Sequence, residues 1–239
     1  MPRHRLLKRT ALFAATATLL TLTGCAAWRI GQSAELARLS EPFQQRPDKP
    51  TRRLLIVGDS TAVGTGASSP ARSLAGLIAQ RHPSWWIENR AQDGATFAQT
   101  LDQLAGEAPF DIVLVQAGGN DVIRLVDLET LDSSIGRVTA AAKRRAVEVV
   151  LMPAGNVGNA PFFFAPLSWW MTQRSRQLHQ LVRQAAERDG ARYVRLFHER
   201  GDDPFVQRPD LNARDGLHPS DAGYRVWFDE LLKQSDAFG

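Results

Sequence analysis

Four short clusters of glycine and polar residues contain the side-chain types that chemistry at an acyl carbon requires. They are Gly58-Asp59-Ser60-Thr61, residues 89–95, Gly118-Gly119-Asn120-Asp121 and Asp215-Gly216-Leu217-His218-Pro219. A serine hydroxyl becomes an effective nucleophile when a neighbouring base takes its proton. Imidazole titrates near neutral pH and can serve as that base. These residue types therefore favour acyl transfer, with Ser60 as nucleophile.

Several other residues of these clusters suit a role in such a reaction. His218 is the candidate base, and Asp215 lies three residues before it, close enough to orient the ring and stabilise the imidazolium. The oxyanion of a tetrahedral intermediate needs fixed hydrogen-bond donors. The backbone N–H groups of Ser60 and Gly94 and the side-chain amide of Asn120 are suitable, and Gly94 has no Cβ to keep a substrate away. Asp121 is interpreted as structural, bonding backbone near the site.

The clusters follow segments whose patterns predict strands of a parallel sheet. Short apolar runs predict strands at residues 53–57, 85–88, 111–116, 147–152 and 192–197. Helical spacing of apolar residues predicts helices at 71–81, 96–105, 129–145, before Gly190 and at 219–234. Alternating strands and helices indicate one doubly wound α/β domain with both sheet faces covered. In such a sheet the loops past the carboxyl ends of the strands meet at one rim, so the four clusters should converge there.

These residues in this order resemble the SGNH (GDSL) hydrolase superfamily of esterases and lipases, over residues 52 to about 235. Gly58-Asp59-Ser60 matches the first sequence block of that superfamily, Gly94 the second, Gly119-Asn120-Asp121 the third, and Asp215-Gly216-Leu217-His218 the fifth. The resemblance implies a flavodoxin-like three-layer α/β/α sandwich with a parallel sheet of about five strands. It also implies metal-free serine hydrolysis, with an oxyanion hole formed by Ser60, Gly94 and Asn120.

The N-terminus has the layout of an export signal. Four basic residues precede the apolar stretch 10–23, which is shorter than the roughly 20 residues of a membrane span. Leu22-Thr23-Gly24-Cys25 resembles a bacterial lipobox, which predicts lipidation of Cys25; an uncleaved anchor or a plain signal peptide are the alternatives. The predicted organisation is a signal peptide at 1–24, the lipidated cysteine and a tether at 25–51, and a hydrolase domain at 52–239.

Charge and location follow from this interpretation. The sequence pI is about 9.7, but removing residues 1–24 takes away four of the 29 basic residues and none of the 25 acidic ones. The mature chain is then neutral, and no basic surface for nucleic acid is expected. We expect a lipoprotein that faces the periplasm. The outer membrane is favoured because Ala26 follows Cys25 where an inner-membrane retention signal commonly has Asp.

An aromatic segment at 161–171 follows the fourth predicted strand and should also lie at the active-site rim. Phe162, Phe163, Phe164 and Trp169 are candidates for an apolar wall or lid that receives an acyl chain or touches lipid. The alternative is a loop that packs on its own domain.

The sequence thus predicts a hydrolase of carboxylic esters, with lipid or acyl esters favoured as substrates. The alternatives are O-deacetylation of an envelope polysaccharide, a non-catalytic binding lipoprotein, and a flavodoxin-like binder of nucleotide or flavin. The glycine-bearing loop at 64–69 lacks the lysine of a phosphate-binding loop. No cluster has metal-ligand spacing, so neither a metal nor a cofactor is expected. The partners we expect are the ester and the membrane; oligomeric state is left open.

Overall fold

The computed structural model describes residues 24 and 27–239 of the chain. Five parallel strands form one sheet in the order β2-β1-β3-β4-β5. The strands are β1 (Arg52–Gly58), β2 (Trp85–Asn89), β3 (Phe110–Gln116), β4 (Ala146–Leu151) and β5 (Arg192–Tyr193). This order is that of the flavodoxin-like doubly wound folds, and it confirms the predicted fold class.

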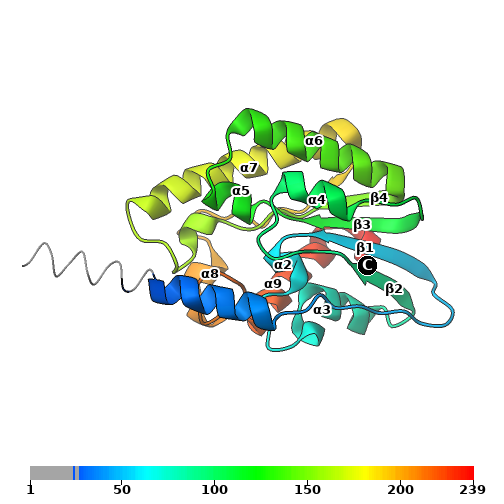
Figure 1. The fold of residues 1–239 in the computed structure, drawn as a ribbon, viewed down its shortest axis with the longest axis horizontal. Helices are drawn as coiled ribbons and strands as arrows, with labels where there is room; N and C mark the ends of the chain where they lie inside the picture. Colours follow the sequence, from blue (N-terminus) through cyan, green and yellow to red (C-terminus); the bar gives the residue numbers. More distant parts are fainter. Residues whose placement is uncertain (1–23, 25–26) are drawn as a thin grey trace, which may run out of the picture.

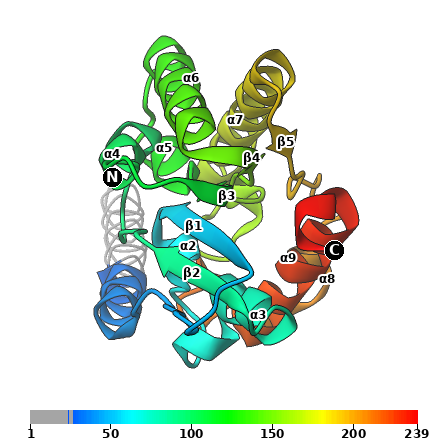
Figure 2. The ribbon, with the colours of Figure 1, turned by 90° about the vertical axis from the view of Figure 1, so that its right-hand side faces the viewer.

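Helices cover both faces of the sheet and complete a three-layer sandwich. One face carries α3 (Leu74–Arg81) and α9 (Asp221–Gln234), and the other carries α4 (Phe97–Gln103), α6 (Leu128–Arg145) and α7 (Leu167–Asp189) (Figures 1 and 2). Three shorter helices lie in the connecting loops, namely α2 (Ser60–Val63), α5 (Gly119–Ile123) and α8 (Pro204–Gln207).

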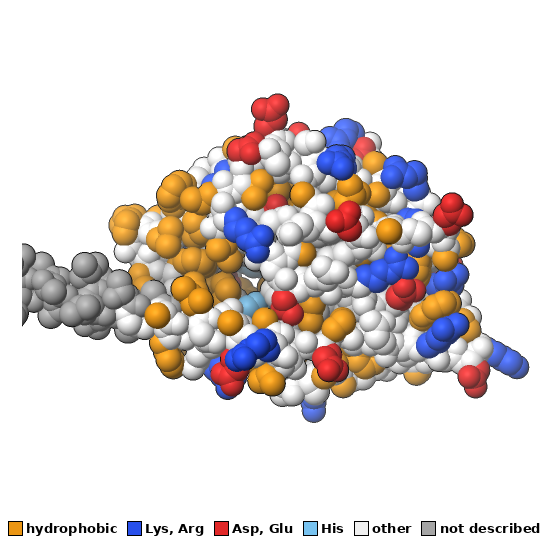
Figure 3. All heavy atoms as spheres, viewed as in Figure 1, with side chains coloured by type: hydrophobic (Ala, Val, Ile, Leu, Met, Phe, Trp, Pro, Cys, Tyr) orange, Lys and Arg blue, Asp and Glu red, His pale blue; other side chains and the backbone are white. Residues whose placement is uncertain are grey.

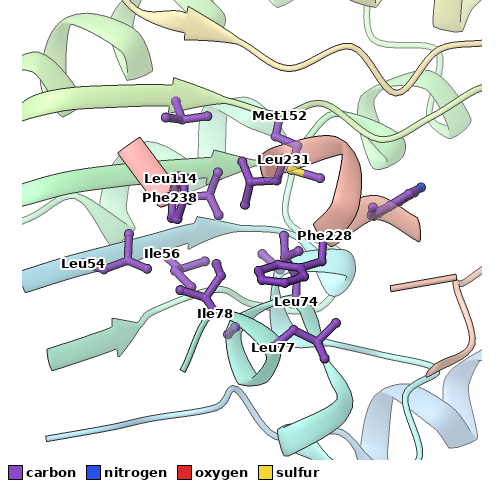
Figure 4. Close-up of a cluster of buried hydrophobic side chains, with 14 of the residues drawn as sticks. Leu54, Ile56, Leu74, Leu77, Ile78, Leu114, Met152, Phe228, Leu231 and Phe238 are labelled. Carbon is purple, nitrogen blue, oxygen red and sulfur yellow. The ribbon is translucent and has the colours of Figure 1, made fainter. Parts of the chain in front are cut away.

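The alternation of side chains along β1 explains the two layers. Leu54 and Ile56 point into the cluster shared with α3 and α9, which Figure 4 shows in close-up. Leu55 and Val57 point into the cluster shared with α4, α6 and α7. Because both faces are buried, the strand needs apolar residues at consecutive positions, which is why it appears in the sequence as an unbroken apolar run.

The fifth strand is shorter than the sequence predicts. Only residues 192 and 193 pair with β4, although the Val194 N–H still donates to the Leu151 carbonyl at 2.9 Å. Beyond that point the chain leaves the sheet edge, and Leu196 and Phe197 are buried elsewhere. The prediction of a continuous strand at 192–197 was wrong. The second half of this apolar run is apolar because its side chains are buried, not because its backbone pairs with β4.

The segment predicted as a tether contains the short helix that the spacing of Ile30, Leu36 and Leu39 allows, but this segment packs on the domain. A helix over residues 27–39 packs on the domain, with Glu35 paired to Arg214 at 3.0 Å. Further along, Gln45 forms an antiparallel bridge with Ile87. Because β2 is an edge strand, its outer backbone groups are free to pair with such a segment, and the tether prediction is corrected for these residues.

Cys25 and the predicted signal peptide, apart from Gly24, lie outside the described residues. Among the helices that the structure describes, none combines the length and apolar character needed to cross a membrane.

Candidate active site

Ser60 lies where the order of strands in the sheet reverses, at the carboxyl end of β1. Asn120 lies nearby, after the neighbouring strand β3. Ligands of doubly wound sheets bind in the crevice at this reversal. Asp59 caps the short helix α2, its side chain accepting the Thr61 N–H at 2.9 Å. That cap fixes the turn that presents the Ser60 hydroxyl.

Gly58 makes this turn possible. Its φ is +149°, and a Cβ placed there would lie 1.8 Å from the Gln116 carbonyl oxygen of β3. Only glycine therefore allows the two strands to approach so closely immediately before Ser60.

The structure brings Ser60, His218 and Asp215 together. His218 Nε2 lies 2.9 Å from Ser60 Oγ, and His218 Nδ1 lies 2.6 Å from Asp215 Oδ2. His218 and Asp215 are buried, whereas Ser60 is half-buried and lines a pocket. This geometry has the form that a relay of nucleophile, base and orienting carboxylate requires.

Asp215 is held as an anion. Burial alone would raise the pKa of its carboxyl, but the His218 ring and the N–H groups of Leu217 and His218 donate hydrogen bonds to it. These bonds outweigh burial, and the pKa of Asp215 lies below its usual value. A charged Asp215 keeps the proton of neutral His218 on Nδ1 and leaves Nε2 free to accept one from Ser60.

The three predicted oxyanion donors border the same pocket. Gly94 adopts φ +77° and presents its backbone there, and Asn120 is oriented by a 3.2 Å hydrogen bond from Nδ2 to the Ala95 carbonyl. Within the described part of the chain, neither the Ser60 N–H nor the Gly94 N–H donates a hydrogen bond to a backbone or side-chain acceptor. Unpaired N–H groups beside a nucleophile are what an oxyanion hole needs.

Asp121 has the structural role that the sequence suggests. Its Oδ2 accepts the Phe97 N–H at 3.0 Å and so ties the start of α4 to α5, while its Oδ1 is buried with no partner within the described residues. Burial raises the pKa of Asp121 to about 6, and the nearby charge of Asp59 adds to the shift. Burial likewise raises the pKa of Asp59.

Sequence reasoning missed Asp93 as a residue of the pocket wall. Its Oδ1 accepts the Thr65 hydroxyl at 2.6 Å, and burial raises the pKa of its carboxyl. The Tyr224 hydroxyl fixes the same turn by donating to the Thr65 carbonyl at 2.8 Å. The position of Asp93 directly before Gly94 was the available signal.

A pocket of about 640 Å³ opens beside Ser60, within the size range of small-molecule sites. In Figure 3 a hollow with a histidine side chain visible inside it lies among hydrophobic side chains. The pocket walls come from the helix at 27–39, from the loop after β4 and from α9; they include Ile30, Ala37, Ala154, Phe162, Leu196 and Trp227.

The pocket continues well past the nucleophile. A Cβ at Gly119, beside Asn120, would lie 3.5 Å from Ala154. Gly155 follows Ala154 in the chain, and a Cβ at Gly155 would lie 3.3 Å from the Leu196 carbonyl and 4.0 Å from the Trp227 ring. The wall is therefore continuous from the oxyanion residues to Trp227, and most of the side chains along it are apolar.

The four aromatic candidates lie in different environments. Phe162 lines the pocket, whereas Phe163 packs against the core cluster of α6 and α7. Phe164 and Trp169 are 55% and 71% exposed. The structure thus brings only Phe162 to the pocket that contains Ser60.

No group of three or more His, Cys, Asp or Glu residues is placed to hold a metal ion within residues 24 and 27–239.

Known protein families and solved structures include several that are similar to this chain. The model of the GDSL-like lipase/acylhydrolase family matches residues 56–226, and no curated protein matches the chain. The fold is similar to that of TesA, with a TM-score of 0.64 and 18% identity over 79% of this chain and 100% of that one. It is also similar to a lipase/acylhydrolase from Enterococcus faecalis (TM-score 0.60, 18% identity, 77% and 94% covered). An acetylxylan esterase from Geobacillus stearothermophilus is a further structural relative (TM-score 0.55, 20% identity, 77% and 94% covered).

Proposed function

This chain belongs to the GDSL-like lipase/acylhydrolase family and is an ester-bond hydrolase, and on that premise we propose that Ser60, His218 and Asp215 form its catalytic triad. The observation that carries the proposal is the continuous relay, 2.9 Å from Ser60 Oγ to His218 Nε2 and 2.6 Å from His218 Nδ1 to Asp215 Oδ2.

In the acylation step, Ser60 Oγ attacks the ester carbonyl carbon while its proton passes to His218 Nε2. The carbonyl oxygen becomes an oxyanion, which accepts hydrogen bonds from the Ser60 and Gly94 N–H groups and from the Asn120 amide. Collapse of the intermediate breaks the bond to the alcohol, and His218 returns the proton to the departing oxygen. An acyl group is left on Ser60.

In the deacylation step, His218 takes a proton from water, and the resulting nucleophile attacks the acyl-enzyme carbonyl. The same three donors hold the second oxyanion. Ser60 Oγ leaves with the proton from His218, and the carboxylic acid is released. Asp215 stabilises the imidazolium in both steps because its carboxylate stays charged next to Nδ1.

We infer that the substrate carries an acyl chain rather than an acetyl group alone. The apolar wall that runs from Ser60 past Ala154 to Leu196 and Trp227 supports this, since burying each methylene of a chain contributes about 0.8 kcal/mol. An acetyl group would leave that wall in contact with water. Removal of O-acetyl groups from an envelope polysaccharide is the alternative, and it predicts best turnover with the shortest acyl chain.

The test is hydrolysis of p-nitrophenyl esters from acetate to palmitate by the wild-type chain, by Ser60→Ala and by Ser84→Ala. Ser84 is an exposed serine outside the pocket and is the matched control. We expect Ser60→Ala to lose about six orders of magnitude in kcat, Ser84→Ala to be unchanged, and medium or long chains to be preferred. Failure of Ser60 to react with a fluorophosphonate, together with no turnover of any ester, would favour a non-catalytic binding lipoprotein instead.

We also propose that Cys25 carries a lipid that anchors the enzyme to the periplasmic face of a membrane, the outer membrane being favoured. The basic and apolar sequence before Leu22-Thr23-Gly24-Cys25 supports this. Wild-type chain grown with radiolabelled palmitate should be labelled and sediment with membranes, and Cys25→Ser should not be labelled. Equal labelling of the two proteins would refute lipidation at this residue.

A further inference from the structure

Large apolar side chains are exposed together at the mouth of the active-site pocket. Exposed fractions are 61% for Trp28, 59% for Ile30, 55% for Phe164, 43% for Leu167, 71% for Trp169 and 55% for Trp170. We call these six residues the apolar rim. Figure 3 shows hydrophobic side chains gathered at this end of the molecule, around the hollow. A gathering of exposed apolar side chains of this kind marks an interaction site rather than ordinary surface.

The rim comes from two segments that are far apart in the sequence and held together in the structure. Trp28 and Ile30 belong to the helix at 27–39, and the other four lie in the loop before α7 and in its first turn. The Arg29 guanidinium lies over the Phe164 ring, 4.6 Å from its centroid, and also donates to the Pro161 carbonyl. The two sides of the rim are therefore fixed relative to each other.

The rim is continuous with the pocket. Ile30 is both exposed and part of the pocket wall, and Phe162 lines the pocket two residues before Phe164. Whatever covers the rim therefore also meets the entrance through which a substrate reaches Ser60.

We propose that the apolar rim inserts into the interfacial region of a lipid bilayer, so that the pocket faces the membrane and takes its acyl ester directly from it. This inference rests on the proposed ester hydrolysis and on the proposed lipid at Cys25, and it deepens the proposed function by naming membrane lipid as the substrate source. Two observations favour a lipid bilayer over a protein partner as the surface that covers the rim. One is the position of Cys25 in the sequence, and the other is the amino-acid composition of the rim.

The first observation is that the proposed lipidation site lies directly before the helix at 27–39 in the sequence. Cys25 lies two residues before residue 27, and two extended residues reach about 7 Å at most. A lipid on Cys25 would thus bring the membrane surface to the start of the helix that carries Trp28 and Ile30. The second observation is that three of the six rim residues are tryptophans, which concentrate at membrane–water interfaces because one part of the ring is apolar and the N–H is polar.

The test compares two substrates on the lipidated full chain, reconstituted in vesicles of phosphatidylethanolamine and phosphatidylglycerol. One is p-nitrophenyl butyrate in the water phase, and the other is p-nitrophenyl palmitate dissolved in the vesicles. The variant Leu167→Ser/Trp170→Ser removes two rim side chains that do not line the pocket. Val147→Ser is the control, since Val147 is 82% exposed at the amino end of β4, opposite the site.

We expect the rim variant to keep wild-type activity on the butyrate and to lose at least fivefold on the palmitate, with Val147→Ser equal to wild type on both. Brominated phospholipids should quench wild-type tryptophan emission, and less so in the rim variant. An unchanged ratio of the two activities, or no quenching, would overturn the proposal and leave the rim to a protein partner. If quenching occurs but wild type hydrolyses neither ester, the proposed function fails and the membrane contact stands.

Discussion

Asp215→Asn gives a sharp prediction because it changes one atom in the relay and leaves its shape unchanged. Asp215 Oδ1 accepts the Leu217 and His218 N–H groups at 3.0 and 3.1 Å, and the Asn side-chain oxygen can keep both bonds. The Asn amide nitrogen then faces His218 Nδ1, where the carboxylate oxygen had been 2.6 Å away. Because that nitrogen donates, Nδ1 must become an acceptor and the ring proton must move to Nε2.

The expected loss follows from the tautomer. With a proton already on Nε2, His218 cannot take the proton of Ser60 at 2.9 Å, and no anion stabilises the imidazolium. The same exchange in a serine protease lowers kcat by about four orders of magnitude, which corresponds to about 5.4 kcal/mol of transition-state stabilisation. We expect a loss of that order here, with little change in KM because the pocket wall is untouched.

The assay is kcat on p-nitrophenyl butyrate at neutral pH, with circular dichroism to check folding. Asp210→Asn is the matched control, since Asp210 is exposed and pairs only with Arg208 at the surface. The pKa of Asp215 lies below its usual value, so the wild-type side chain is charged throughout the assay range. A folded Asp215→Asn within tenfold of wild type would show that the carboxylate does not control the tautomer of His218.

Three further predictions concern stability and specificity. Gly58→Ala puts a Cβ 1.8 Å from a backbone carbonyl and should lower the free energy of unfolding by about 3 kcal/mol in urea titrations; Gly201→Ala, with nothing within 4 Å, is the control. The raised pKa of Asp121, about 6, means that its contribution to stability is present at low pH and is lost as pH rises through 6. Asp121 should thus account for a loss of up to about 3 kcal/mol as the pH rises from about 4 to 6. Because burial also raises the pKa of Asp59, Asp121→Asn should reduce the pH dependence of stability rather than abolish it; equal slopes in the two proteins would contradict the assignment. On soluble esters, Phe162→Ser should lower octanoate but not acetate kcat/KM about tenfold, whereas Phe164→Ser should change neither, and equal effects of the two variants would refute the assignment of Phe162 to the pocket.

The sheet and the convergence of the polar clusters could be predicted because both follow from local patterns. Buried parallel strands need unbroken apolar runs, and Leu54 to Val57 form one. Three clusters follow strands directly, and the fourth, at 215–219, comes after β5 and a loop. A fold rule about carboxyl ends therefore places them together without any knowledge of side-chain contacts. Ser60, His218 and Asp215 needed nothing more than that rule and their chemistry.

The walls of the pocket could not be predicted in the same way. Ala154, Leu196 and Trp227 are buried apolar residues, and their types do not distinguish a pocket wall from a core. Ile30, Leu36 and Leu39 are spaced so that a short helix could form at 27–39, but the polar, proline-bearing surroundings favoured a tether, and nothing local indicated that the helix packs on the domain. Its position depends on contacts distant in sequence, such as Glu35 with Arg214 and Gln45 with the edge strand β2. Such contacts form only after the sheet exists.

The carboxylates around Ser60 show why type and spacing alone do not assign chemical roles. Asp59 and Asp121 are as buried as Asp215, yet burial raises their pKa values while that of Asp215 is lowered. Asp215 faces the His218 ring and two N–H groups, whereas Asp121 has one oxygen without a partner in the described structure. Asp59 accepts hydrogen bonds from the Thr61 N–H and hydroxyl, but for its carboxyl burial outweighs them. A carboxylate that must stabilise an imidazolium has to remain an anion in a buried site, and hydrogen-bond donors and a neighbouring imidazole both favour that anion. A carboxylate that merely ties α4 to α5 does not have to stay charged, so the surroundings of Asp215, more than its spacing to His218, support its proposed role as the partner of the base.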